Sequence, residues 1–206
     1  VFGDCSVLKL PNVSEMMVEH GGFFTTPDAG ELEKEIYDSL ADTSDVVSAF
    51  IIGTHYDTPI AYVLDDAFSA QLRLNAQTNQ LLTVNGSWKN KTTKYRGYEV
   101  YRGTISSTGA QTQDDFNSAG NTGKAYLFVQ AITGTATSAT IKVQGDSDSG
   151  FSSPVDLGTF TFSAEGVQEL TFNSTVHRYI RINCTSLGGA TNFTVACVVC
   201  SSGVTF

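Results

Sequence analysis

The cysteine and histidine residues near the end of the sequence are the first candidates for a metal site. Cys197-Val-Val-Cys200 has the spacing of half of a zinc site, and Cys184 and His177 lie upstream of it. The apolar residues around the pair predict a β-strand, in which side chains three positions apart point to opposite faces. One tetrahedral ion could hardly take both thiolates from such a strand, so we predict no metal site and interpret these cysteines as small apolar core residues.

A second metal-like pattern is Asp146-Ser-Asp148-Ser-Gly150, which resembles the opening of a calcium-binding loop. The twelfth position of that loop would be Leu157, where calcium loops carry an acidic ligand. We therefore interpret the segment as a polar hairpin turn, with a peripheral calcium site as the less favoured alternative.

The three histidines are the only side chains suited to acid–base catalysis at neutral pH: His20, His55 and His177. None of them lies in a recognisable nucleophile or metal motif. His55 and Asp57, on a predicted loop, form the best candidate pair for such chemistry. Glycine patterns that cradle phosphate are missing from the sequence. We predict that the protein is not an enzyme and uses no cofactor.

Aromatic and basic residues near the end of the chain could bind a sugar by stacking and hydrogen bonding. The candidates are Tyr126, Tyr179 and Arg178, whereas the only tryptophan, Trp88, lies outside this region. A role in the core or in an interface is the favoured interpretation of these aromatic residues. A carbohydrate-binding or adhesin-like surface module is our alternative hypothesis for function.

The composition indicates a β-rich protein with a substantial core. The chain has 206 residues, of which 41% are hydrophobic and only 16% are charged. Its formal net charge of −9 argues against a protein that binds nucleic acid by neutralising phosphates. No apolar run reaches the ~18–20 residues of a membrane-spanning helix, so we expect no membrane anchor. Four cysteines are too few for a disulfide scaffold, and a reducing compartment is the simpler interpretation.

Residues 1–105 are predicted to form a first domain with one helix and several strands. Asp28 and Glu31 have the spacing of a capping box, and Leu32, Ile36 and Leu40 repeat at four-residue intervals, which predicts a helix over about 28–41. Strands are predicted at 46–52, 60–64, 68–74, 80–85 and 94–105.

Residues 106–123 contain one aromatic residue and many small polar ones, which predicts a linker. Beyond it, short apolar runs separated by turn residues predict a β-sandwich over 124–206, either Ig-like or a jelly roll. The predicted strands are 125–131, 139–144, 157–162, 168–173, 178–184 and 193–200.

The order of these elements is similar to that of a known family. The segments ELEKEIYDSL, DVVSAFIIGT and TPIAYVLDD, followed by an alternating strand and a hairpin, resemble the major tail proteins, or tail tube proteins, of long non-contractile-tailed bacteriophages. The segments KAYLFVQAITGTATSATIKVQGDSDSGFSSPVDLGTFTF, VHRYIRIN and NFTVACVV resemble the β-sandwich often appended to such proteins. The resemblance covers nearly the whole chain.

The resemblance implies a structural virion protein with a tail-tube-like β-sandwich or barrel, carrying one α-helix, as its first domain. Copies of that domain would form hexameric rings that stack into a tube, and the second domain would lie outside it. The implied partners are further copies of the chain and other tail proteins. Genomic DNA would pass through the tube into the host without specific binding, and the tail would be assembled in the host cytoplasm.

The first domain has 14 acidic and 8 basic residues, and an acidic channel would repel DNA phosphates. Our candidates for acidic positions at the channel or at ring interfaces are Asp45, Asp57, Asp65 and Asp66. Scattered, solvated loop charges are an equally good interpretation of these four residues. Alternation in 68–74 gives a second set of candidates for a polar face on the channel: Ser69, Gln71 and Arg73.

Overall fold

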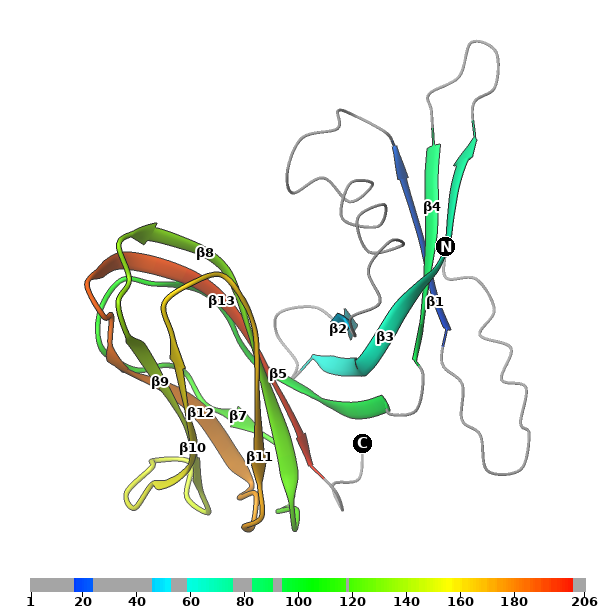
Figure 1. Ribbon diagram of the computed structural model, residues 1–206. Coiled ribbons are helices and arrows are strands. Elements are labelled where there is room, and N and C mark those ends of the chain that lie inside the picture. Colours follow the sequence, from blue (N-terminus) through cyan, green and yellow to red (C-terminus); the bar gives the residue numbers. More distant parts are fainter. Residues whose placement is uncertain are drawn as a thin grey trace. The chain divides into compact units, whose positions relative to one another are not determined.

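The described part of the chain is built from β-strands that form two antiparallel sheets, one of eight strands and one of five (Figure 1). The computed structural model describes residues 17–23, 46–52, 59–75, 83–90, 94–117 and 119–201. No helix occurs within these ranges, and the helix predicted at about 28–41 lies outside them. The prediction of a mainly β protein is confirmed.

The chain divides into two compact units, which we describe separately. The first consists of residues 1–49 and 63–95, and the second of residues 50–62 and 96–206. The strands that lie wholly or partly in the first unit are β1 (Met17–Phe23), β2 (Val46–Ile52), β3 (Ile60–Asn75) and β4 (Thr83–Asn90). β4 lies between β1 and β3 and is antiparallel to both.

β3 is one strand of 16 residues, where the sequence predicted two shorter ones at 60–64 and 68–74. Asn85-Gly86, which has the composition of a turn, lies inside β4 and pairs with β1 on one side and with β3 on the other. The register of β3 against β4 shifts between Ser69 and Gln71. A shift of this kind marks a β-bulge or a similar irregularity in the ladder.

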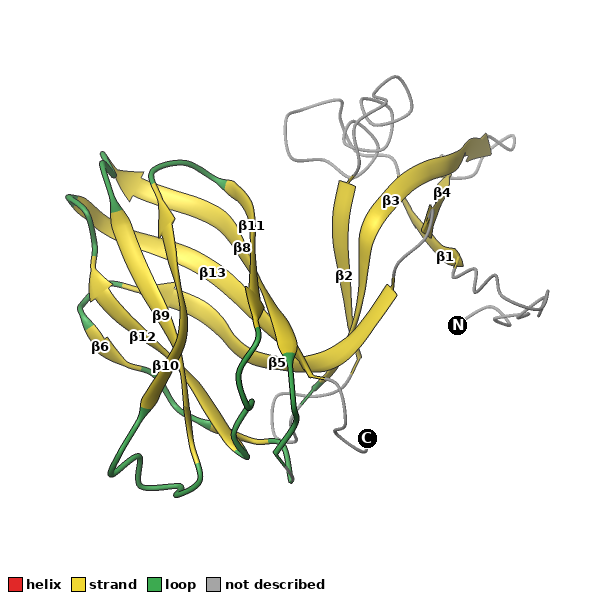
Figure 2. Cartoon of the chain, turned by 60° about the horizontal axis from the view of Figure 1, so that its bottom comes forward, coloured by secondary structure: helices red, strands yellow, loops and turns green. Residues whose placement is uncertain are grey.

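The remaining strands belong wholly or mostly to the second unit. They are β5 (Lys94–Ile105), β6 (Gly109–Ala110), β7 (Asp114–Asp115), β8 (Gly123–Gly134), β9 (Ala139–Asp146), β10 (Val155–Phe162), β11 (Gly166–Phe172), β12 (Tyr179–Ser186) and β13 (Ala190–Ser201). In one layer the order is β5-β13-β8-β11, and in the other it is β10-β9-β12-β6 (Figure 2). β7 is also paired to β12. All the strands predicted in 124–206 are present.

The inward faces of these two layers form a sandwich-like hydrophobic core. Alternate residues of β9, β12 and β13 point into it, and β13 is buried on both faces over its second half. Large side chains at its centre include Ile141, Ile182 and Phe193, each 0% exposed. The rings of Phe162 and Phe193 meet edge to face with their centroids 5.1 Å apart, which joins β10 in one layer to β13 in the other.

Residues 106–123, predicted as a linker, are part of the second unit. β6 pairs with Asn183 and Cys184 of β12, and β7 pairs with Tyr179 and Ile180 of the same strand. Phe116 is 1% exposed, and its ring centroid lies 4.8 Å from that of Tyr98. Small polar residues can pair their backbone groups with an open strand edge as well as larger residues can. The composition of this segment therefore predicted a linker where the structure has two short strands.

Candidate ligand-binding face of the five-stranded sheet

The outward face of the five-stranded sheet carries the densest group of polar side chains whose contacts the structure describes. Strand alternation places Ile141 and Val143 of β9 in the core, and therefore turns their neighbours outward. β12 alternates in the same way around Ile180 and Ile182. We call this surface the polar face and define it by Thr140, Lys142, Gln144, Asp156, Tyr179, Arg181, Asn183 and Thr185.

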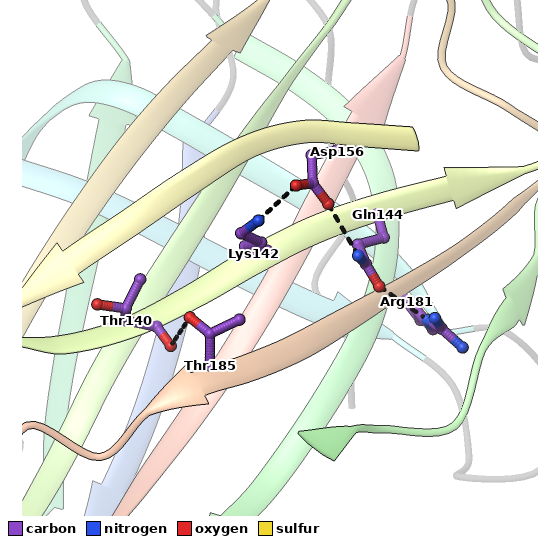
Figure 3. A network of polar contacts seen from close by, with 6 residues as sticks. All are labelled: Thr140, Lys142, Gln144, Asp156, Arg181 and Thr185. Carbon is purple, nitrogen blue, oxygen red and sulfur yellow. Dashed lines mark hydrogen bonds and ion pairs between the residues drawn. The ribbon is translucent and has the colours of Figure 1, made fainter. Parts of the chain in front are cut away.

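A chain of polar contacts crosses the polar face from β10 to β12 (Figure 3). Lys142 Nζ lies 2.5 Å from Asp156 Oδ2, and Gln144 Nε2 donates a hydrogen bond of 2.8 Å to Asp156 Oδ1. Lys142 and Gln144 together lower the pKa of Asp156 below its ordinary value. Near the start of β9, Thr185 Oγ1 donates a hydrogen bond of 3.3 Å to the backbone oxygen of Thr140.

Arg181 is the arginine of the polar face, and two neighbouring side chains hold its guanidinium group in place. Its Nε donates a hydrogen bond of 3.1 Å to Gln144 Oε1, and its Cζ lies 4.1 Å from the ring centroid of Phe151. Gln144 and Phe151 are both only 7% exposed, so the plane of the guanidinium is held from two sides. Among the described residues, no acceptor bonds to the two terminal nitrogens of Arg181.

Arg178, a candidate for sugar binding, is committed to an ion pair. Its Nε and Nη2 donate to the two carboxylate oxygens of Asp115 over 2.8 and 2.6 Å. This pairing lowers the pKa of Asp115 and fastens β7 to the start of β12. The Cζ atom of Arg178 also lies 5.0 Å from the ring centroid of Tyr179. Tyr179 is half-buried at the edge of the polar face.

Tyr126, a second sugar-binding candidate, is 0% exposed and cannot stack on a ligand, which corrects that part of the sugar-binding hypothesis. Tyr126 lies near the start of β8, which pairs with β11 on one side and with β13 on the other. Trp88 lies in β4, and the structure describes its backbone position alone.

The segment Asp146–Gly150 begins the turn between β9 and β10, as predicted. Asp146 accepts hydrogen bonds from the backbone N–H groups of Asp148 and Ser153, over 3.0 and 2.9 Å. Asp148 in turn accepts from the N–H of Gly150 and from the hydroxyl of Ser152. These bonds lower the pKa of Asp146 and use the carboxylates to close the loop. The interpretation as a polar hairpin turn is confirmed.

The cysteines of β12 and β13 are buried core residues. Cys184, Cys197 and Cys200 are free thiols with at most 3% exposure. Burial raises the pKa of the Cys197 thiol, which keeps it protonated. In the described ranges, no three histidine, cysteine or acidic side chains are grouped so that they could hold a metal ion.

A pair of acidic side chains lies near Cys197. Burial raises the pKa of Asp114 in β7 to about 7, and the negative charge of Glu99 in β5 adds to this effect. Glu99 is 7% exposed and is held by Arg102, whose Nε and Nη2 donate to its two oxygens. The two carboxyl groups therefore lie close enough for the charge of one to affect the protonation of the other.

The predicted channel residues are only partly covered by the structure. Asp45 and Asp57 lie outside the described ranges, as does His55. The others are brought together on β3: Asp65, Asp66, Ser69, Gln71 and Arg73. The pairing of β3 with β4 runs from Ala67 to Asn75 and places Gln71 opposite Ser87 and Arg73 opposite Asn85. Their assignment to a channel stays a prediction.

Two of the three histidines, His20 and His177, lie within the described ranges. His20 lies in β1 opposite Gly86, and His177 lies half-buried beside Gly145. Sequence reasoning missed Arg181, Gln144 and Phe151. The alternation in Tyr179-Ile-Arg181-Ile places Arg181 on an outward face, but its contact with Phe151 joins two segments 30 positions apart and has no signal in the sequence.

Comparison with known proteins gives no family assignment: no family model matches the chain, and no curated protein matches it. The described ranges also contain no helix of the length and apolar character that crossing a membrane requires.

Proposed function

We propose that this protein is a structural virion subunit that assembles into the tail tube of a long non-contractile-tailed bacteriophage. Its copies form stacked, hexameric rings around a channel through which DNA is ejected into the host. The proposal rests on the resemblance of the sequence to major tail proteins and on a mainly β architecture in two units. Other tail proteins are the further partners, and the tail is assembled in the host cytoplasm.

The observation that carries this proposal is the position of β1 in the first unit. β1 pairs with β4 along its full length, from Met17 opposite Lys89 to Phe23 opposite Thr83. Among the described strands, no other pairs with β1, and we propose that the second row of its backbone N–H and C=O groups pairs with another chain. An edge of this kind promotes uncontrolled aggregation unless a specific partner covers it. A second copy of the same unit is the partner that a ring requires.

The charge of the first half of the chain supports a role as a conduit. Residues 1–105 carry 14 acidic and 8 basic side chains, whereas residues 124–206 carry 5 and 4. A channel lined from the first half would therefore repel phosphate groups and let DNA pass without being held. Asp45, Asp57, Asp65 and Asp66 are the proposed acidic positions, and Ser69, Gln71 and Arg73 the proposed polar strand positions on the channel.

The second unit fits the role of an outer domain in this proposal. Its core is formed by residues of its own two layers, from Tyr98 to Val199. A unit with its own core can project from a tube without taking part in the wall. We propose an Ig-like or jelly-roll sandwich as its fold type.

Proline substitutions on β1 test the proposal. In an antiparallel pair, successive residues direct their N–H groups alternately toward the partner and away from it. Of Glu19→Pro and His20→Pro, one therefore disrupts the pairing with β4, and the other removes an N–H only from the open edge. We expect the variant that keeps the wild-type melting temperature to lose the ring-sized species in sedimentation velocity.

The wild-type chain is the first control and should sediment as rings or longer assemblies. A second control is Val167→Pro in β11, the terminal strand of a layer in the second unit. Wild-type protein that stays monomeric as its concentration is raised, or a folded β1 variant that assembles like wild type, would contradict the role of this edge.

A further inference from the structure

We propose that the polar face of the five-stranded sheet binds a carboxylated sugar residue of a surface glycan, with Arg181 as the group that recognises the carboxylate. This function goes beyond tube formation and does not depend on it. It rests on the orientation of Arg181, the charges around it and the side chains on either side of it on β12.

Arg181 is held in place in advance of any ligand. Its Nε is bound to Gln144 Oε1 at 3.1 Å, and its plane rests on Phe151 with Cζ 4.1 Å from the ring centroid. Gln144 is fixed in turn by its hydrogen bond of 2.8 Å to Asp156. The two terminal nitrogens, which have no partner among the described residues, form a planar fork that matches the two oxygens of a carboxylate. Because the side chain is already ordered, binding loses little conformational entropy.

Arg181 is the one charged side chain of the polar face that forms no ion pair with a described residue. Lys142 is neutralised by Asp156, and Arg178 is neutralised by Asp115. Asp146, opposite Tyr179, is a further carboxylate on β9; its oxygens accept backbone hydrogen bonds from Asp148 and Ser153, and it keeps its negative charge while it directs those oxygens into the loop. An anion is therefore attracted to Arg181 although the chain as a whole has a net charge of −9.

The neighbours of Arg181 on β12 indicate that the anion is part of a sugar. Tyr179 and Asn183 lie two residues to either side on the same face, and both are half-buried. Two residues of a strand span about 7 Å, which is the length scale of one sugar ring. The Tyr179 ring offers an apolar surface for the C–H groups of such a ring, and the Asn183 amide can bond its hydroxyl groups.

The experiment measures binding of the full-length chain to an array of glycans that contain uronic or sialic acids, with each glycan paired to its carboxyl-reduced counterpart. The test variant is Arg181→Lys, which keeps the charge but loses the fork and the contact with Phe151. The matched control is Arg102→Lys in β5, an arginine bound to Glu99 on the other layer. We expect carboxylated glycans to bind better than their reduced partners, and Arg181→Lys to weaken binding about tenfold or more. Arg102→Lys should change it less than about twofold.

Separate outcomes decide between this ligand and others. Equal binding of carboxylated and reduced glycans, or no binding by either, would overturn the proposal, as would an unchanged affinity of Arg181→Lys. Competition with inorganic phosphate and with an acidic peptide tests whether the site binds a sugar or any anion. We expect Tyr179→Ala to weaken glycan binding, and full displacement by either competitor at equal concentration would assign the site to anions in general.

Discussion

At the scale of single residues, the acidic side chains of the second unit show how the environment sets their charge. Asp156 and Asp115 each accept hydrogen bonds from a cation, and their pKa values are lowered. Asp114 lies one residue from Asp115, but burial and the charge of Glu99 raise its pKa to about 7. The pKa values of adjacent residues in the same short strand are therefore shifted in opposite directions.

Asp114→Asn tests this difference. The pKa of Asp114 is about 7 in the folded chain, while an unfolded aspartate has a pKa of ~3.9, so wild-type stability falls as pH rises between these two values and is lowest above about 7. We expect the variant to match wild type at pH 4 and to gain about 1–3 kcal/mol in unfolding free energy at pH 8. This gain is smaller than the difference between the folded and unfolded pKa values alone would give, because the carboxyl is partly exposed.

Urea unfolding at pH 2, 4, 6 and 8 measures this change. Asp156→Asn is a control whose stability should depend on pH in the opposite direction, because the pKa of Asp156 is lowered in the folded chain. The stability that Asp156 provides is present above its unfolded pKa and is lost on acidification, so the control should lose less than about 1 kcal/mol at pH 8 and nothing at pH 2. An equal effect of Asp114→Asn on the unfolding free energy at pH 4 and pH 8 would show that ionisation of the Asp114 carboxyl does not destabilise the folded chain.

At the scale of elements, residues 109–117 act as a strap on the open edge of β12. Gln111 N donates to Ile182 O over 2.9 Å, and Phe116 N donates to Arg178 O over 2.8 Å, so backbone bonds hold both ends of the strap. The buried ring of Phe116 is its hydrophobic anchor. The strap thereby closes an edge of the five-stranded sheet that would otherwise be open to other chains.

Phe116→Ala is expected to destabilise the chain by about 3–5 kcal/mol, because it leaves a cavity beside Tyr98 and removes the anchor of the strap. The exposed Gln113→Ala on the same strap is the matched control and should change stability by less than about 0.5 kcal/mol. Chemical unfolding of both variants measures the difference. A loss below about 1 kcal/mol for Phe116→Ala would mean that the segment contributes as little as a linker does.

The sequence predicted the strands well where apolar residues alternate or run together, and the ranges 46–52 and 94–105 match β2 and β5. It did not predict the strap, because backbone pairing leaves little trace in Ser, Thr and Gly. The candidate site was predictable in part: Tyr179 was named, but Arg181 was not. The contact that orients Arg181 depends on where the loop carrying Phe151 folds, and that position is set by tertiary structure.

At the scale of the whole molecule, the chain combines two units with different properties. The second unit has its own core and a sheet edge covered by a strap. The first unit contains the β1–β4–β3 ladder, in which β1 has a single partner among the described strands. In our account the first unit is completed by copies of itself, and the polar face of the second unit remains available to a ligand.

Electron microscopy of the purified full-length chain, over a range of protein and salt concentrations, tests this account most directly. The account predicts rings with a central opening, which stack into tubes as the protein concentration rises. Fields of single particles the size of one chain, under all of these conditions, would contradict it.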